Sequence, residues 1–210
     1  MPKKFRIEKR VVFEKSYLKV FLLDKSQSVS VKRILDLAST VRKCNISEEA
    51  NLIVYPNPFY SIDEVAIDVE NLLVGYLDGS VLLDTTKNQC VATQSKLTSY
   101  AEAKALYDKA LFGIYMGADY RHALDDLRLA LETLLKRVFG NEKSMENQGD
   151  ALGAYLGAKG ISSEIVGNVK VNLIAVSRYF NEHEKHKDNV KANEIDYIVA
   201  AVNNIVNILL

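Results

Sequence analysis

The segment RYFNEHEKH, residues 178–186, holds the side chains most suited to chemistry in this chain. It runs from the end of a predicted helix into a polar stretch. Histidine exchanges a proton readily near neutral pH, and arginine carries a fixed charge on a rigid fork of donors that suits phosphate. Arg178, His183 and His186 could therefore support the binding or cleavage of a phosphodiester.

Two further polar residues accompany this set. Asn181 could orient a phosphate or an imidazole, and Lys185 would add electrostatic attraction. We favour His186 over His183 as the reactive imidazole, because His183 extends the apolar stripe of the helix, whereas His186 lies near the helix end and can reach Arg178. The alternative is that this charged segment is a solvated helix terminus, in which Lys and His side chains complement the helix dipole.

We expect no metal ion and no cofactor at this site. Glu182 and His186 could share a helix face, but no further His or Cys completes a typical set of ligands. Cys44 and Cys90 are far apart and belong to no metal or redox spacing, which favours reduced thiols in a cytoplasmic protein. No uncharged stretch approaches the roughly 18 residues of a membrane span, so we expect no membrane association.

Charge is unevenly distributed, although the formal net charge is zero. Residues 1–43 hold 12 Lys or Arg against 4 Asp or Glu, and residues 44–95 hold 1 against 8. The basic segment could bind nucleic acid, with the candidate residues Lys32, Arg33, Arg42 and Lys43. The alternative is that it packs against the acidic segment within one domain.

Residue types change near residue 95. All three prolines precede this point and all three histidines follow it. The polar runs at residues 85–89 and 93–96 predict a turn and a linker. We therefore predict a mainly α protein, with a small α+β module of unknown role over residues 1–95 and an antiparallel helical bundle over residues 96–210.

The first part has a mixed pattern. Residues 11–23 are rich in β-branched and aromatic side chains, which predicts one or two strands, and residues 30–43 have helical spacing. Ser61 and Glu64 predict a capping box that opens a helix through about Leu77. These elements fit a small α+β module, and a winged-helix unit would also fit.

The second part has helical patterns throughout. His122 is expected to be a surface or packing residue, and Glu132 with Lys136 a surface ion pair. Four or five helices with short connections make a bundle. The patterns predict helices over residues 100–116, 120–139 and 149–156, then from Ser162 or Ser163 through Phe180, and finally from Asn193.

The penultimate helix is apolar on two sides. One stripe ends at Phe180, and Val171 and Ile174 lie roughly opposite it, since an α-helix advances about 100° per residue. A helix that is apolar on both sides is buried on both sides, so we expect a second subunit to cover the second side. Arg178 and Asn181 continue that side, and two-fold symmetry would bring both copies of the cluster close together.

This second part, over about residues 97–210, resembles the HEPN superfamily and within it the abortive-infection C-terminal type. HEPN domains are helical bundles, usually dimeric, with an Arg, then four to six residues, then a His, at the end of the third helix and in the loop before the fourth. Arg178-x4-His183 is similar to this motif, and residues 119–136 look like the family's first helix. The family commonly has Asn or Asp directly after the Arg, whereas this chain has Tyr179, and Asn181-x4-His186 gives a second registration.

The resemblance implies a metal-independent endoribonuclease of a bacterial or phage defence or toxin–antitoxin system. It further implies a homodimer, RNA as the substrate and a cognate antitoxin protein as a partner. In that reaction a His would act on the ribose 2′-hydroxyl as general base, and Arg178 would stabilise the charge that develops on the phosphorus. Other HEPN domains are inactive, so the alternative is a non-catalytic dimeric module that binds nucleic acid or protein.

Overall fold

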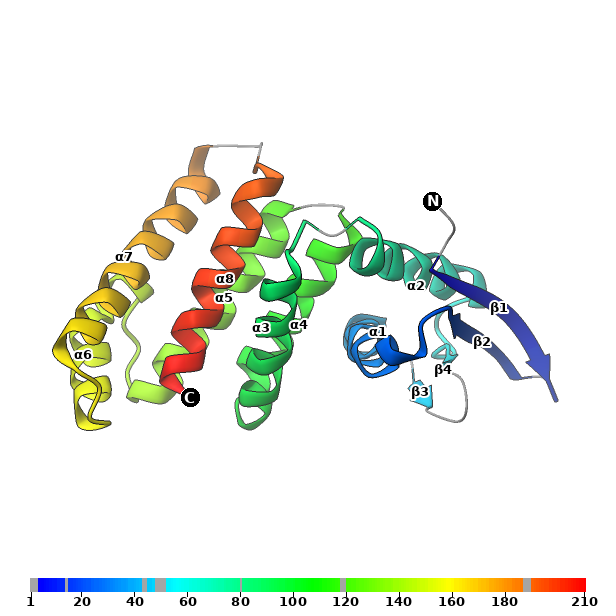
Figure 1. Cartoon of the computed structure of the whole chain (residues 1–210), viewed down its shortest axis with the longest axis horizontal. Helices are drawn as coiled ribbons and strands as arrows, with labels where there is room; N and C mark the ends of the chain where they lie inside the picture. The colour runs from blue at the N-terminus through cyan, green and yellow to red at the C-terminus, as the bar shows by residue number, and fades with distance from the viewer. Residues whose placement is uncertain are drawn as a thin grey trace. The chain divides into compact units, whose positions relative to one another are not determined.

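The computed structural model describes residues 4–13, 15–42, 45–47, 52–79, 81–117, 120–186 and 190–210, and the side chains of these residues except 38–42, 45–47 and 183–186. The chain is mainly helical, with a small antiparallel sheet in its first part (Figure 1), which confirms the predicted coarse fold class. It divides into two compact units. Unit 1 comprises Met1–Val81 with Leu111–Ala118, and unit 2 comprises Leu82–Ala110 with Asp119–Leu210.

Unit 1 is built on a four-stranded antiparallel sheet with the strand order β1-β2-β4-β3. The region predicted to hold one or two strands contains β2 and the end of β1. The strands are β1 (Phe5–Val12), β2 (Lys15–Leu22), β3 (Asn45–Ser47) and β4 (Leu52–Tyr55), and the helical segments of this part are η1 (Lys25–Gln27), α1 (Ser28–Arg42) and α2 (Ile62–Leu77).

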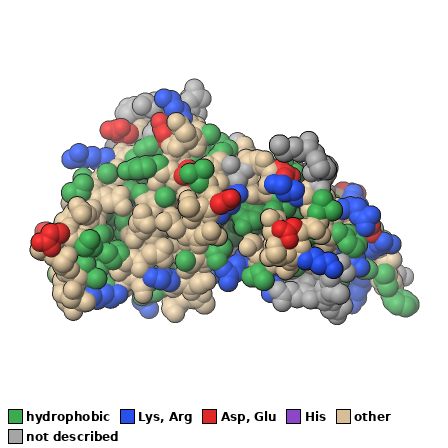
Figure 2. All heavy atoms as spheres, in the orientation of Figure 1, with side chains coloured by type: hydrophobic (Ala, Val, Ile, Leu, Met, Phe, Trp, Pro, Cys, Tyr) green, Lys and Arg blue, Asp and Glu red, His purple; other side chains and the backbone are tan. Residues whose placement is uncertain are grey.

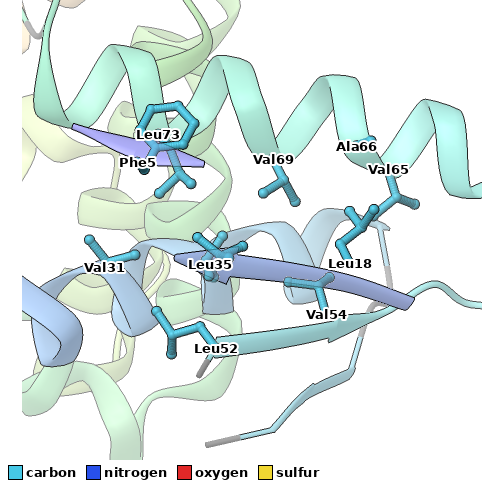
Figure 3. Packing of buried hydrophobic residues seen from close by; sticks show 11 residues of the cluster. Phe5, Leu18, Val31, Leu35, Leu52, Val54, Val65, Ala66, Val69 and Leu73 are labelled. Carbon is cyan, nitrogen blue, oxygen red and sulfur yellow. The ribbon is translucent and has the colours of Figure 1, made fainter. Parts of the chain in front are cut away.

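One face of this sheet forms the core of unit 1 together with α1 and α2 (Figure 3). Side chains alternate between the two faces of a strand, so Leu18 and its cross-strand partner Val54 point to the same side, where both are fully buried. Leu35 of α1 and Val69 of α2 complete this layer with no exposed surface. The core therefore occupies one face of the sheet and leaves the other face outside it.

Local sequence signals set the limits of α2. The backbone N–H of Glu64 donates to Ser61 Oγ at 3.2 Å, and the N–H of Ser61 donates to Glu64 Oε2 at 2.9 Å, which confirms the predicted capping box. The helix ends at Leu77, as predicted. Near this end Gly75 is required, because a Cβ there would overlap the carbonyl oxygen of Tyr115 in the last turns of α4 (Ala101–Met116).

Unit 2 is a bundle of helices, and the predicted helices of this part are confirmed within a few residues at their ends. They are α3 (Asp84–Lys96), η2 (Leu97–Ser99), α4 (Ala101–Met116) up to Ala110, α5 (Tyr120–Phe139), η3 (Met145–Asn147), α6 (Gly149–Ala158), α7 (Ser163–His186) and α8 (Ala192–Leu209). Within the described ranges, none of the helices combines the length and the apolarity that crossing a membrane requires.

Helix α3 was not predicted. The turn at residues 85–89 and the linker at residues 93–96 are wrong, because these residues form one continuous helix that lies in unit 2. The error has a physical cause: the buried face of α3 carries Thr86, Cys90 and Thr93 rather than an apolar stripe. A search for hydrophobic periodicity cannot detect a helix whose buried side chains are mainly polar.

Two side chains on the buried face of α3 accept hydrogen bonds from α8. Asn203, which has no exposed surface, accepts a hydrogen bond from Tyr107 Oη at 2.6 Å and donates to Cys90 Sγ at 3.4 Å. One turn later Asn207 donates to Thr93 Oγ1 at 3.3 Å. Burial raises the pKa of the Cys90 thiol, so this group stays protonated at neutral pH. These bonds fix the register of α3 against α8.

Replacing Asn203 tests this buried contact. We predict that Asn203→Ala lowers the free energy of unfolding by about 2 to 3 kcal/mol, because it removes two buried hydrogen bonds, one from Tyr107 and one to Cys90. Asn204→Ala is the matched control, since Asn204 is exposed and its removal should cost less than about 0.5 kcal/mol. Equal losses of stability in urea unfolding of the two variants would contradict a structural role for the buried amide.

Candidate functional site

Helix α7 carries the predicted site at its C-terminal end. Its inner side is buried in unit 2, where Leu173, Val176 and Phe180 are each at most 2% exposed. This confirms the predicted stripe. Because α7 continues to His186, the segment that holds Arg178 is helical rather than a loop. Its side chains therefore keep the angular positions that the helix imposes.

The other side of α7 is exposed. Val171 and Ile174 are 67% and 41% exposed, and Arg178 and Asn181 are exposed one and two turns further along the same side. The structure therefore brings together two of the predicted site residues, directly after an exposed apolar strip. The second subunit that would cover this strip stays a prediction.

The remaining predicted site residues are distributed between the two units. The side chains of His183, Lys185 and His186 lie outside the described residues, and the choice between the two histidines stays open. In unit 1, Lys32 and Arg33 are half-buried on α1. The side chain of Arg42 and the whole of Lys43 lie outside the described residues, so this predicted nucleic-acid-binding set is also untested.

Tyr179, the residue that departs from the HEPN pattern, connects α7 to α8. Its half-buried hydroxyl donates to Glu194 Oε2 in the first turn of α8 at 3.2 Å. Burial, and then the adjacent Glu194 carboxylate, raise the pKa of Tyr179 well above its usual range. The hydroxyl remains a donor at every physiological pH and holds α7 against α8 beside Arg178.

A cavity of about 440 Å³ lies between the start of α5 and the inner side of α7. Its wall combines cationic, acidic and apolar groups, so it suits a ligand that has both an anionic and an apolar part. Its lining includes Arg121, His122, Asp125, Arg128, Phe180 and Val190. The sequence predicts His122 as a surface or packing residue, and the structure shows it exposed; the two arginines were not predicted to have a role.

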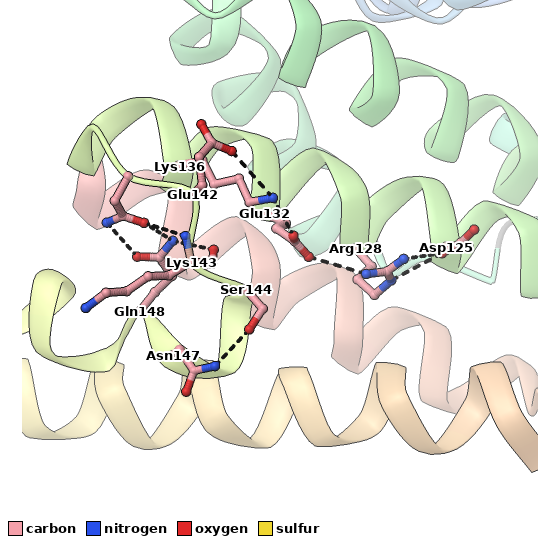
Figure 4. A network of polar contacts seen from close by, with 10 residues as sticks. Asp125, Arg128, Glu132, Lys136, Glu142, Lys143, Ser144, Asn147 and Gln148 are labelled. Carbon is pink, nitrogen blue, oxygen red and sulfur yellow. Dashed lines mark hydrogen bonds and ion pairs between the residues drawn. The ribbon is translucent and has the colours of Figure 1, made fainter.

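Arg128 in this wall belongs to a chain of ion pairs along α5 (Figure 4). Its guanidinium donates to Asp125 Oδ1 at 3.1 Å and to Glu132 Oε2 at 3.3 Å. Lys136 contacts the other oxygen of Glu132 at 2.9 Å, which confirms the predicted Glu132–Lys136 pair, and this contact raises the pKa of Lys136. The spacing of three and four residues is the signal that predicts such a chain from sequence.

A second cavity, of about 550 Å³, lies at the opposite end of α5. Lys136 and Arg137 line it from α5, and the first turn of α4 lines it from the other side. None of the predicted site residues contributes to it. Among the described residues, no three His, Cys, Asp or Glu side chains are grouped so that they could hold a metal ion.

No known protein family, curated protein or solved structure matches this chain.

The α5 ion-pair chain yields a stability prediction. Glu132→Gln should lower the melting temperature by about 2 to 4 °C, because Glu132 joins two cations and its side chain is only 17% exposed. Glu142→Gln is the matched control, since that carboxylate is 92% exposed and lies 4.0 Å from Lys136. The difference between the melting-temperature shifts of the two variants should be smaller in 0.5 M salt, which screens the ion pairs. Equal shifts in melting temperature at both positions would show that the ion pairs along α5 do not stabilise the fold.

Proposed function

We propose that unit 2 is a HEPN-like bundle and that the chain is a dimeric, metal-independent endoribonuclease of a bacterial or phage defence or toxin–antitoxin system. The observation that supports this most directly is the position of Arg178 and Asn181. Both are exposed in the last turns of α7, on the side that begins with the exposed apolar residues Val171 and Ile174. A seam between two subunits would end at these polar groups.

The reaction that fits these groups is transesterification within RNA. A His of the 183–186 segment removes the proton from a ribose 2′-hydroxyl, whose oxygen then forms a bond to the adjacent phosphorus. The bond from phosphorus to the 5′-oxygen breaks, and that oxygen takes up a proton. The products are a 2′,3′-cyclic phosphate and a 5′-hydroxyl end.

Arg178 has a defined role in this reaction. Negative charge grows on the phosphoryl oxygens as the new bond forms, and a guanidinium with two parallel donors stabilises that charge more than it stabilises the ground state. Asn181, one turn away on the same side of α7, orients the phosphate or the imidazole.

The first test is RNA cleavage by the purified full chain. Arg178→Ala should lower the cleavage rate at least about 100-fold, the usual cost of removing a donor that stabilises a transition state. Arg137→Ala removes an equal charge from an exposed position at the far end of α5 and should cleave at the wild-type rate. The products should carry 5′-hydroxyl ends that polynucleotide kinase labels without prior phosphatase treatment.

Two results would contradict the proposal of a nuclease. One is the absence of cleavage by the wild-type chain across total RNA. The other is cleavage that persists in Arg178→Ala and in the His183→Ala, His186→Ala double variant, which would identify a contaminant. The alternative function, a non-catalytic dimeric binding module, predicts the first of these results together with an intact dimer.

The second test concerns the dimer. Ile174→Glu places a charge on the exposed side of α7 and should convert a dimer into monomers in light-scattering measurements, because a buried unpaired carboxylate is strongly unfavourable. Ile165→Glu is the matched control on the same helix. Ile165 is 45% exposed, close to the 41% of Ile174, but it lies on the opposite side of the helix. A wild-type monomer, or dissociation by both variants alike, would contradict the proposed seam.

A further inference from the structure

The face of the unit 1 sheet that points away from α1 and α2 has an unusual composition. We call it the outer face, and its members follow from strand register, since alternate residues of each strand share a face. Arg6 pairs with Phe21, Glu8 with Lys19 and Arg10 with Tyr17 across β1 and β2. The outer face comprises Arg6, Glu8, Arg10 and Val12 of β1, Lys15, Tyr17, Lys19 and Phe21 of β2, and Ile53 and Tyr55 of β4.

Aromatic rings occupy two places on the outer face. Tyr17 and Tyr55 lie side by side on β2 and β4, with ring centroids 5.9 Å apart and planes inclined at 45°. Phe21 lies four residues further along β2, about 13 Å away. Tyr55 is 36% exposed, and the other two rings are half-buried. Rings in an exposed sheet face are the groups on which unstacked bases stack.

Cations lie between and over these rings. The guanidinium of Arg6 lies 4.7 Å from the centroid of the Phe21 ring, and the ammonium of Lys19 lies 5.1 Å from it. Arg10 is directly opposite Tyr17 in the register. A guanidinium plane can itself stack on a base, so Arg6 extends the aromatic surface rather than blocking it.

The outer face carries a clear excess of positive charge. Its described side chains include four cations, Arg6, Arg10, Lys15 and Lys19, and one carboxylate, that of Glu8. Glu8 contacts both arginines and holds them apart along β1. Figure 2 shows Lys and Arg side chains gathered over β1 and β2.

Among the described residues, the acidic second segment forms no ion pair with the cations of this face. Ion pairs join this segment to other residues near the start of the chain. Lys4, just before β1, contacts Asp78 at 3.2 Å, and Lys9 of β1 contacts Asp63. Lys9 belongs to the other face of the sheet by strand alternation. The idea that the basic segment packs against the acidic one therefore accounts for these two lysines but not for the four cations of the outer face, of which Arg6 and Arg10 are paired with Glu8 of the same strand.

A hollow adjoins one end of the outer face. It has a volume of about 320 Å³ and is lined by Phe5, Arg6, Phe21, Leu22 and Leu23. The hollow thus places apolar walls beside the Arg6 guanidinium and the Phe21 ring. This combination suits a flat, partly apolar group that is attached to an anion, as a base is attached to its phosphate.

We propose that the outer face binds single-stranded nucleic acid, with bases stacked at Tyr17–Tyr55 and at Phe21 and with the backbone phosphates held by Arg6, Arg10, Lys15 and Lys19. Single strands fit better than a duplex, because rings can stack only on bases that are not already paired and stacked. The proposal goes beyond the proposed function and does not depend on it, since binding at this face requires neither cleavage nor the α7 residues.

The experiment measures fluorescence anisotropy of labelled 12-nucleotide oligouridine and oligothymidine with the full chain. All variants carry His183→Ala and His186→Ala, so that cleavage cannot affect binding. In the charge test, Arg10→Gln with Lys19→Gln should weaken binding at least about tenfold. The slope of log affinity against log salt should fall by about 1.4, since each phosphate that is no longer neutralised reduces it by about 0.7. The matched control, Arg137→Gln with Lys143→Gln, removes one Arg and one Lys from exposed positions of unit 2 and should leave both values unchanged.

The stacking test uses Tyr17→Leu with Tyr55→Leu, which keeps apolar side chains on the strands. Binding should weaken at least about fivefold, in proportion to the loss of base stacking, whereas the salt slope should stay at its wild-type value. Circular dichroism and melting temperature check that each variant is folded. A lower affinity with an unchanged salt slope would show that the variant has lost base stacking rather than contacts to phosphate.

Several outcomes would overturn this proposal. They are the absence of binding to both oligonucleotides, equal affinity for duplex and single strands, or a weakening in the unit 2 control as large as that in the outer-face variant. Binding to phosphatidylserine vesicles that the outer-face variants abolish, without oligonucleotide binding, would assign the face to membranes instead. A preference between oligouridine and oligothymidine would identify RNA or DNA as the ligand. Failure of RNA cleavage by the wild-type chain would leave this result untouched.

Discussion

The arrangement of unit 2 depends on the burial of α8. Its apolar residues are buried on nearly every turn, and α3, α5 and α7 each pack against it. Apolar burial is not directional, so the position of each neighbour along α8 has to be set by other contacts. Asn203 sets the position of α3, and Tyr179 with Glu194 sets that of the end of α7. Once α7 is docked through Val176 and Phe180, Arg178 must point away from the bundle.

In unit 1, too, the burial of one side determines which residues are exposed, but here the alternation is that of a strand rather than a helix. A strand exposes every second residue to each face, so the burial of Leu18 and Val54 forces Lys19 and Tyr55 to the other side. In both units, the residues with candidate functions are those that remain outside after the apolar side has packed. Packing thus determines where cations and aromatic rings are exposed, and the exposed residue types determine what these surfaces can bind.

Sequence reasoning succeeded where a local signal determines the structure. The Ser61–Glu64 capping box, the apolar stripe of α7 and the Glu132–Lys136 pair each depend on residues within one or two helical turns. It failed at α3, whose buried residues are mainly polar and gain hydrogen bonds from Asn203 and Asn207, more than 100 residues later. Strand register is equally non-local. The outer face could not be recognised until β1, β2 and β4 were paired, although every one of its residues was visible in the sequence.

The candidate site was predictable only in part, for the same reason. The angular positions of Arg178 and Asn181 follow from helix geometry alone. The cavity wall of Arg121, His122 and Arg128 does not, because it forms only where the start of α5 meets the inner side of α7. The two surfaces that we propose to contact nucleic acid thus differ in kind, since one consists of exposed residues at a helix end and the other of a half-exposed sheet face.

Ultraviolet cross-linking of single-stranded RNA to the full chain, with mass-spectrometric mapping of the modified peptides, examines both surfaces in one measurement. The account predicts adducts in the peptides that contain Tyr17, Phe21 or Tyr55 and in the peptide that begins after Arg178. Adducts confined to α1, around Lys32 and Arg33, or the absence of adducts at RNA concentrations that saturate binding, would contradict it.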